Sequence, residues 1–125
     1  KVKKIQNIRK KNWNIFNQLI DKLDTKKFYL IKSSQESTST YHILALIFRT
    51  TKLANEFKKI FQNNRIAATF HYVPLHKSRM GKQFCNYKLP ITENIYNRVV
   101  RLPLYSDMTK QEINKISALI KNFLV

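Results

Sequence analysis

Glycine and cysteine are among the residues that this sequence has least of. Of its 125 residues, one is glycine (Gly81) and one is cysteine (Cys85). Loops that cradle phosphate use several glycines, because the backbone must approach the anion closely. The sequence therefore excludes an independent enzyme that holds a phosphorylated cofactor in a P-loop or dinucleotide-binding loop. A single cysteine cannot form an internal disulfide, so a reducing, cytoplasmic setting is expected.

Long apolar runs are also missing. No run approaches the roughly 20 residues that a membrane helix needs, and no apolar stretch after Lys1 could serve as a signal peptide. We therefore expect no membrane partner. The chain begins with Lys and not Met, so we expect it to be a piece of a longer protein. What is present is 43% apolar residues over the length of one ordinary domain, enough for a folded core.

Acidic residues are few, and the charge has two interpretations. Seven Asp and Glu oppose 24 Lys and Arg, which gives a net charge of +17. A small basic nucleic-acid-binding domain is one interpretation. However, 18 Lys, 12 Asn and 14 Ile are enriched together, as in A/T-rich coding sequences, and only six residues are Arg. Since the lysines are spread along the chain and Arg is the better phosphate ligand, we attribute the charge to codon usage and keep nucleic-acid binding as the alternative.

The hydrophobic pattern predicts the element order α-β-β-α-β-α-β-α. The expected helices cover residues 5–23, 53–64, 93–99 and 109–123, and the expected strands cover 28–31, 41–49, 66–73 and 102–105. The uninterrupted apolar run in 41–49 indicates a central strand or one covered on both faces. Thr50 and Thr51 offer a helix cap, and Thr109 with Glu112 forms a capping box. Helices packed on one small sheet give a two-layer α+β fold.

The histidines are the main candidates for chemistry. A metal site is not favoured, because His71 and His76 are five residues apart across Pro74 and match no helical ligand pair. Cys85 has no activating neighbour and is expected to be a buried apolar residue. Residues 70–76 place two aromatics, two histidines and a proline at a strand end, where binding loops collect. From these residues alone a core strand end is favoured slightly over a turn that faces a sugar or cofactor.

Three separated stretches resemble the C-terminal domain of the DegT/StrS family. His71, Tyr72, Pro74 and His76 match an H-Y-x-P-x-H pattern, and Leu102 to Tyr105 match an L-P-L-aromatic pattern before the last helix. The opening helix with Arg9 and the strand led by His42 resemble further parts of that domain. The family consists of pyridoxal-phosphate-dependent sugar-nucleotide aminotransferases. The resemblance implies that residues 1–125 are the small C-terminal domain of a fold-type I enzyme whose large, cofactor-binding domain is absent.

The resemblance also implies a substrate and a set of binding residues. Residues 70–76 with Gly81 and Phe84 are most similar to the dTDP-4-amino-4,6-dideoxygalactose transaminases. These enzymes convert a dTDP-4-keto-6-deoxy-sugar to the 4-amino sugar for surface polysaccharide synthesis, usually with glutamate as the amino donor. The implied substrate-binding residues are His71, Tyr72, His76, His42 and Arg101. A solvated surface charge is the alternative for Arg101.

The family's Schiff-base lysine lies in a glycine-containing stretch of the large domain, and nothing in this chain resembles it. We therefore expect no catalytic residue here, no covalently bound pyridoxal phosphate and no turnover by this chain alone. It would be a cut fragment, a gene remnant or half of a split enzyme. Its expected partners are the large domain or a split half, a second subunit of the full enzyme and the dTDP-sugar. Without them, Trp13 and the opening helix are the elements expected to expose apolar surface.

Overall fold

The computed structural model describes residues 1–23, 26–34, 36–70, 72–84 and 87–124. In chain order the elements are helix α1 (Val2–Asp21), strands β1 (Phe28–Leu30) and β2 (Leu44–Phe48), helix α2 (Thr51–Asn63), the 3-10 turn η1 (Leu75–Lys77), helices α3 (Gly81–Phe84) and α4 (Pro90–Tyr96), strand β3 (Val99–Leu102) and helix α5 (Lys110–Leu124). Among the described residues, none of the helices is both long and apolar enough to cross a membrane.

The three strands form one antiparallel sheet in the order β1-β2-β3. Phe28 pairs with Phe48 across β1 and β2, and Leu44 pairs with Leu102 across β2 and β3. All five residues of β2 are buried, which confirms the prediction of a central strand. The strand begins at Leu44 and not at Tyr41, because Tyr41 has a φ of 50°. That left-handed conformation is incompatible with extended backbone.

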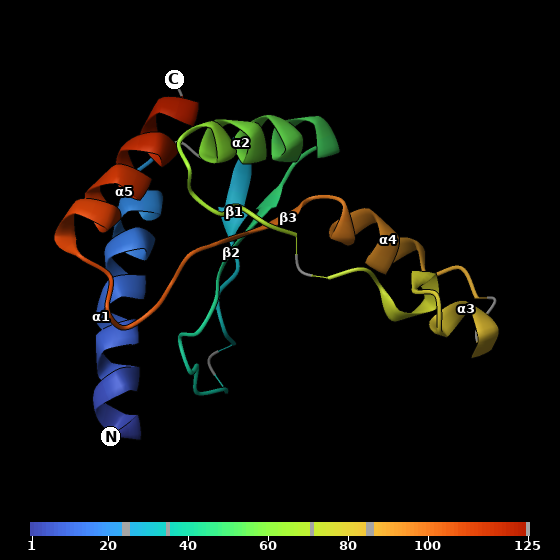
Figure 1. Cartoon of the computed structure of the whole chain (residues 1–125), viewed down its shortest axis with the longest axis horizontal. Coiled ribbons are helices and arrows are strands. Elements are labelled where there is room, and N and C mark those ends of the chain that lie inside the picture. Colours follow the sequence, from blue (N-terminus) through green and yellow to red (C-terminus); the bar gives the residue numbers. More distant parts are fainter. Residues whose placement is uncertain (24–25, 35, 71, 85–86, 125) are drawn as a thin grey trace.

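Helices α1, α2 and α5 pack on one face of the sheet and enclose the core (Figure 1). The largest fully buried side chains are Phe16, Phe28, Phe48, Phe57, Phe61, Leu44, Leu46, Leu102, Ile120 and Val100. Burying each of the phenylalanines contributes about 1.5–3 kcal/mol. The rings of Phe28, Phe48, Phe57 and Phe61 contact one another, with centroids 4.3 Å apart for Phe57 and Phe61. The arrangement confirms the predicted two-layer α+β fold.

The second face of the sheet is turned away from these helices. Because side chains alternate along a strand, this face carries the residues that lie between the core positions. They are Tyr29 of β1, Ala45 and Ile47 of β2, and Val99 and Arg101 of β3. Tyr29 is 46% exposed, and Val99 and Arg101 are half-buried.

The predicted helix caps are formed. The Leu53 N–H donates to Thr50 Oγ1 at 3.2 Å, which begins α2. At the start of α5, the Glu112 N–H donates to Thr109 Oγ1 at 3.2 Å, and the Thr109 N–H donates back to Glu112 Oε2 at 2.7 Å. This reciprocal pair satisfies two backbone donors that a helix start would otherwise leave unpaired.

The prediction of a strand over residues 66–73 is wrong. Of the described residues there, Thr69 alone pairs, in an isolated antiparallel bridge with Arg101. The chain enters this stretch through Arg65, which is left-handed with a φ of 58°. Beyond Thr69 it leaves the sheet, and Phe70 and Tyr72 are exposed. A fourth strand would need continued pairing along the free edge of β3.

The boundaries of α4 and β3 lie earlier in the chain than predicted. Helix α4 begins at Pro90 and ends at Tyr96, and β3 covers Val99–Leu102. Proline is tolerated in the first turn of a helix, where its missing N–H is not needed. Pro103 lacks the N–H that strand pairing requires, so it follows the strand and does not lie within it.

The described residues of the range 70–96, which we call the projecting segment, extend away from the body of the protein (Figure 1). The segment contains η1, α3 and α4. Several of its described apolar side chains are exposed, among them Leu75 (85%), Phe84 (81%) and Tyr87 (77%). By contrast, Trp13 is half-buried and packs against the core. The expectation that Trp13 exposes apolar surface is therefore wrong, whereas the opening helix does expose apolar side chains, among them Val2 (68%) and Ile5 (40%).

Candidate functional site

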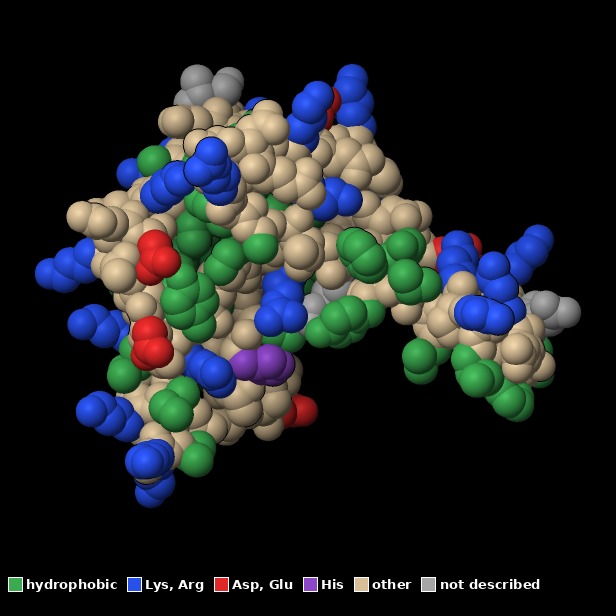
Figure 2. Space-filling model, in the orientation of Figure 1, with side chains coloured by type: hydrophobic (Ala, Val, Ile, Leu, Met, Phe, Trp, Pro, Cys, Tyr) green, Lys and Arg blue, Asp and Glu red, His purple; other side chains and the backbone are tan. Residues whose placement is uncertain are grey.

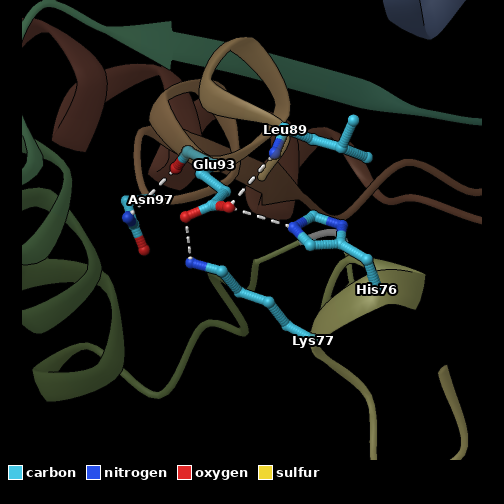
Figure 3. A network of polar contacts seen from close by, with 5 residues as sticks. All are labelled: His76, Lys77, Leu89, Glu93 and Asn97. Atoms are coloured by element: carbon cyan, nitrogen blue, oxygen red, sulfur yellow. Dashed lines mark hydrogen bonds and ion pairs between the residues drawn. The ribbon is translucent and has the colours of Figure 1, made fainter. Parts of the chain in front are cut away.

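Glu93 links the two ends of the projecting segment through a polar network (Figure 3). One carboxylate oxygen, Oε1, lies 3.2 Å from His76 Nε2 on η1 and accepts from the Leu89 N–H at 3.4 Å. The other, Oε2, lies 2.6 Å from Lys77 Nζ. The His76 side chain is only 7% exposed, so this network fixes a nearly buried imidazole against α4.

The network stabilises the charged form of Glu93. The hydrogen bond from Lys77, followed by that from His76, lowers the pKa of Glu93 from 4.5 to about 2. The carboxylate also lies in the first turn of α4, where the helix dipole favours a negative charge. Glu93 is therefore ionised at neutral pH and acts only as a hydrogen-bond acceptor.

Gly81 allows the tight backbone that places His76. Ser78 Oγ donates to the Leu75 carbonyl at 2.8 Å, and the Gly81 N–H donates to Ser78 Oγ at 2.9 Å. A Cβ at position 81 would lie 1.7 Å from the Leu75 carbonyl oxygen. The single glycine is thus required by close backbone approach between α3 and η1.

Tyr72 and His76 line neighbouring cavities in the projecting segment. His76 lines a cavity of about 550 Å³ with Gly81 and Phe84. Tyr72, which is 66% exposed, lines a cavity of about 460 Å³ beside α4. Leu75 and Thr92 line both cavities. The structure therefore brings these two predicted site residues into one region.

His42 lies in a separate region, two residues before β2, beside a cavity that Trp13 of α1 also lines. It is exposed, its Nδ1 is 2.6 Å from Thr40 Oγ1, and it lines a cavity of about 410 Å³ with Trp13 and Lys32. Tyr41 beside it contacts Trp13 edge-on, with ring centroids 5.6 Å apart. Val99 of β3 lines both this cavity and the Tyr72 cavity.

Arg101 lies two residues further along β3, on the same face of the strand as Val99. Its backbone exchanges two hydrogen bonds with Thr69, at 2.7 and 3.0 Å, and it pairs with Ala45 in the sheet. The remaining predicted site residue, His71, lies outside the described residues, as does Cys85.

Sequence reasoning missed Glu93 and Lys77. An acidic residue in the first turn after Pro90 signals a helix start, but it does not identify a histidine partner 17 residues earlier in the sequence. In the part of the chain that the structure describes, no three His, Cys, Asp or Glu side chains could together hold a metal ion. The lysines and arginines are scattered over the face seen in Figure 2 and form no single basic patch there.

The described residues do not fit a complete pyridoxal phosphate site. Such a site needs a lysine that reaches the cofactor and several donors around its phosphate. The one glycine serves close packing, as shown above. Three of the described lysines line cavities: Lys32 pairs with Asp21 at 2.8 Å, and Lys115 donates to the Asn64 carbonyl at 2.9 Å. The third, Lys58, lines a cavity whose described lining residues include no second basic side chain. We therefore assign no catalytic step that involves pyridoxal phosphate to the described residues.

The fold is similar to that of solved aminotransferases. The aminotransferase TlmJ from Streptoalloteichus hindustanus is 15% identical, with 98% of this chain and 32% of that chain covered and a TM-score of 0.86. Helicobacter pylori PseC, an aminotransferase involved in the biosynthesis of pseudoaminic acid, is 15% identical, with 96% and 33% covered and a TM-score of 0.81. The sugar aminotransferase CalS13 from Micromonospora echinospora is 14% identical, with 94% and 30% covered and a TM-score of 0.79.

At these identities the likeness shows the fold, and this chain spans about a third of the length of each structure. No individually curated protein matches the sequence. Residues 1–121, however, match the family model of the DegT/DnrJ/EryC1/StrS aminotransferases. Nearly the whole chain is covered by that match, and the chain belongs to the DegT/DnrJ/EryC1/StrS aminotransferase family.

Proposed function

We propose that this chain is the C-terminal domain of a pyridoxal-phosphate-dependent sugar-nucleotide aminotransferase. The supporting observation is the family match over residues 1–121 in a chain that spans about a third of similar solved enzymes. The parent enzyme would convert a dTDP-4-keto-6-deoxy-sugar to its 4-amino sugar for surface polysaccharide synthesis. The large domain, from the same enzyme or a split half, would supply the Schiff-base lysine and hold the cofactor, and the complete enzyme would be a homodimer.

In this proposal the chain contributes one wall of the sugar site. Tyr72 offers an exposed aromatic ring, and His76 an imidazole held in a fixed orientation by Glu93. An aromatic face can pack on a sugar ring, and an imidazole can bond a sugar hydroxyl. His71 is proposed as a further substrate-binding residue on the sequence resemblance alone.

His42 and Arg101 are proposed to bind the substrate from the sheet. His42 lines the cavity beside β3, and Arg101 lies on the second face of that strand. The guanidinium of Arg101 provides forked donors suited to an anionic group, such as a phosphate or the carboxylate of the amino donor. Pyridoxal phosphate, held by the large domain, would supply the electron sink for amino transfer.

Amination by the complete enzyme tests this function. The longest reading frame that contains this chain would be expressed and incubated with glutamate and dTDP-4-keto-6-deoxyglucose, with the product identified by mass spectrometry. We expect the 4-amino sugar nucleotide. If only the corresponding UDP-sugar were aminated, the proposed substrate would have to carry UDP in place of dTDP. A folded, cofactor-loaded enzyme that aminates no keto sugar nucleotide would overturn the proposal.

A further inference from the structure

We propose that Glu93 is a positioning residue that fixes which nitrogen of His76 carries the proton. It holds the imidazole by Nε2–H and leaves Nδ1 as a hydrogen-bond acceptor in the cavity between η1, α3 and α4. In that cavity, Nδ1 accepts a hydrogen bond from a hydroxyl of the ligand. That last step rests on the proposed function, whereas the role of Glu93 rests on the geometry.

Contacts with residues other than His76 hold the Glu93 carboxylate in place. Oε2 of Glu93 is 2.6 Å from Lys77 Nζ, and Oε1 accepts from the Leu89 backbone N–H at 3.4 Å. The remaining contact of Oε1 is with His76 Nε2, at 3.2 Å. Figure 3 shows the ring approaching Glu93 by this nitrogen, with the second ring nitrogen directed away from the carboxylate.

The charge of Glu93 then decides the tautomer. With its pKa lowered to about 2 by the bonds from Lys77 and His76, the carboxylate is ionised and cannot donate. The contact with His76 is a hydrogen bond only if Nε2 carries the proton. A neutral imidazole has one N–H, so Nδ1 is left with its lone pair.

The surroundings of His76 define what Nδ1 can bind. Leu75, Phe84 and Leu89 line the adjacent cavity of about 550 Å³, so its walls are mainly apolar. Among the hydrogen bonds between described residues, His76 takes part in one, through Nε2. An acceptor set beside apolar side chains suits a ligand that donates a hydrogen bond at this point and places apolar surface against the surrounding walls. A sugar hydroxyl meets that requirement.

Nitrogen-15 NMR of the imidazole tests the tautomer on this chain itself, without ligand or large domain. In the neutral form of the wild type, we expect His76 to be protonated at Nε2. In Glu93→Gln, whose amide can accept or donate, we expect the ratio of the Nε2–H to the Nδ1–H form to fall about tenfold. Glu56→Gln, on the exposed side of α2, is the matched control and leaves the ratio unchanged.

An unchanged ratio in a folded Glu93→Gln chain, or an Nδ1–H form in the wild type, overturns the proposal. If Glu93→Gln disturbs the backbone spectrum of the projecting segment, solvent exchange of the Nε2–H proton in the wild type decides. Exchange slower than that of exposed His42 supports the bond to Glu93, and exchange as fast as His42 overturns it. These outcomes leave the proposed amino transfer untouched, and a failed amination assay leaves the tautomer result standing.

Discussion

At the scale of single residues, His76 joins a fixed polar contact to a candidate ligand cavity. Its side chain is 7% exposed and bonds Glu93, while the same residue lines the cavity shared with Gly81 and Phe84. A histidine in this position can serve the fold, the sugar or both. Substitution separates these roles when stability and turnover are measured on the same variant.

We expect His76→Ala in the complete enzyme to weaken use of the sugar nucleotide while cofactor binding stays intact. The loss of transition-state stabilisation should be roughly 1–3 kcal/mol, the cost of leaving a polar partner unpaired. Steady-state kinetics and thermal unfolding of the variant would be compared with Met80→Ala, an exposed neighbour in the same segment. Normal sugar-nucleotide kinetics in a well-folded His76→Ala enzyme would remove His76 from the site.

Glu93 makes the stability of the projecting segment depend on pH. Its pKa in the folded chain is about 2, below the ordinary 4.5, chiefly because of Lys77. A lowered pKa means that the stabilisation is complete above about 4.5 and is lost as the pH falls through about 2. We expect the Leu89 amide signal, which reports on this carboxylate, to titrate near 2 and to lose that titration in Glu93→Gln. A midpoint near 4.5 would contradict the network.

At the scale of elements, the left-handed residue that follows the C-cap of α2 is not glycine. Arg65 has a φ of 58°, its N–H donates to the Gln62 carbonyl at 2.9 Å, and the Ile66 N–H donates to the Phe61 carbonyl at 2.9 Å. This is the Schellman pattern, in which glycine is the usual residue at the left-handed position. The chain therefore holds Arg65 in a conformation that costs a non-glycine residue free energy.

Arg65→Gly should raise the free energy of unfolding by about 1 kcal/mol, because glycine adopts this conformation without a steric penalty. Chemical denaturation of the chain would measure the change. Arg65→Ala is the matched control, since it removes the same side chain but keeps the Cβ, and it should give no such gain. Equal effects of the two substitutions would show that the arginine side chain, and not the backbone, is responsible.

The elements that were predicted well have local causes. The caps at Thr50 and Thr109 and the buried run of β2 are each specified by neighbouring residues, and all three are found. Residues 66–73 are also largely apolar, but they can form a strand only by pairing with β3. That pairing cannot be predicted from the local sequence. The Glu93–His76 contact was unpredictable for the same reason, because an irregular stretch of chain separates the two residues.

At the scale of the whole molecule, exposed apolar side chains gather in the projecting segment. Leu75, Phe84 and Ile91 are each at least 75% exposed. Figure 2 shows apolar side chains on the surface of this part of the protein. Exposed patches of this kind mark surfaces that other protein normally covers. In the proposed enzyme, the rest of the subunit or its dimer partner would cover them.

We expect the isolated chain to bind a hydrophobic dye and to associate in solution, since nothing then covers the projecting segment. Replacing Leu75 and Phe84 by serine should reduce both effects, measured by dye fluorescence and light scattering. Val2→Ser, at an apolar residue of α1 that is 68% exposed, is the control and should change little. A monodisperse wild-type monomer that binds no dye would contradict this expectation.

The central claim is that this chain is one domain of an aminotransferase whose Schiff-base lysine lies elsewhere. The most direct test is to titrate the chain with pyridoxal phosphate, record its visible absorption, reduce it with borohydride and map the labelled lysines by mass spectrometry. We predict no saturable absorption band and only scattered, substoichiometric labelling of its 18 lysines. A saturable Schiff-base band, with stoichiometric label on one lysine of this chain, would contradict the claim.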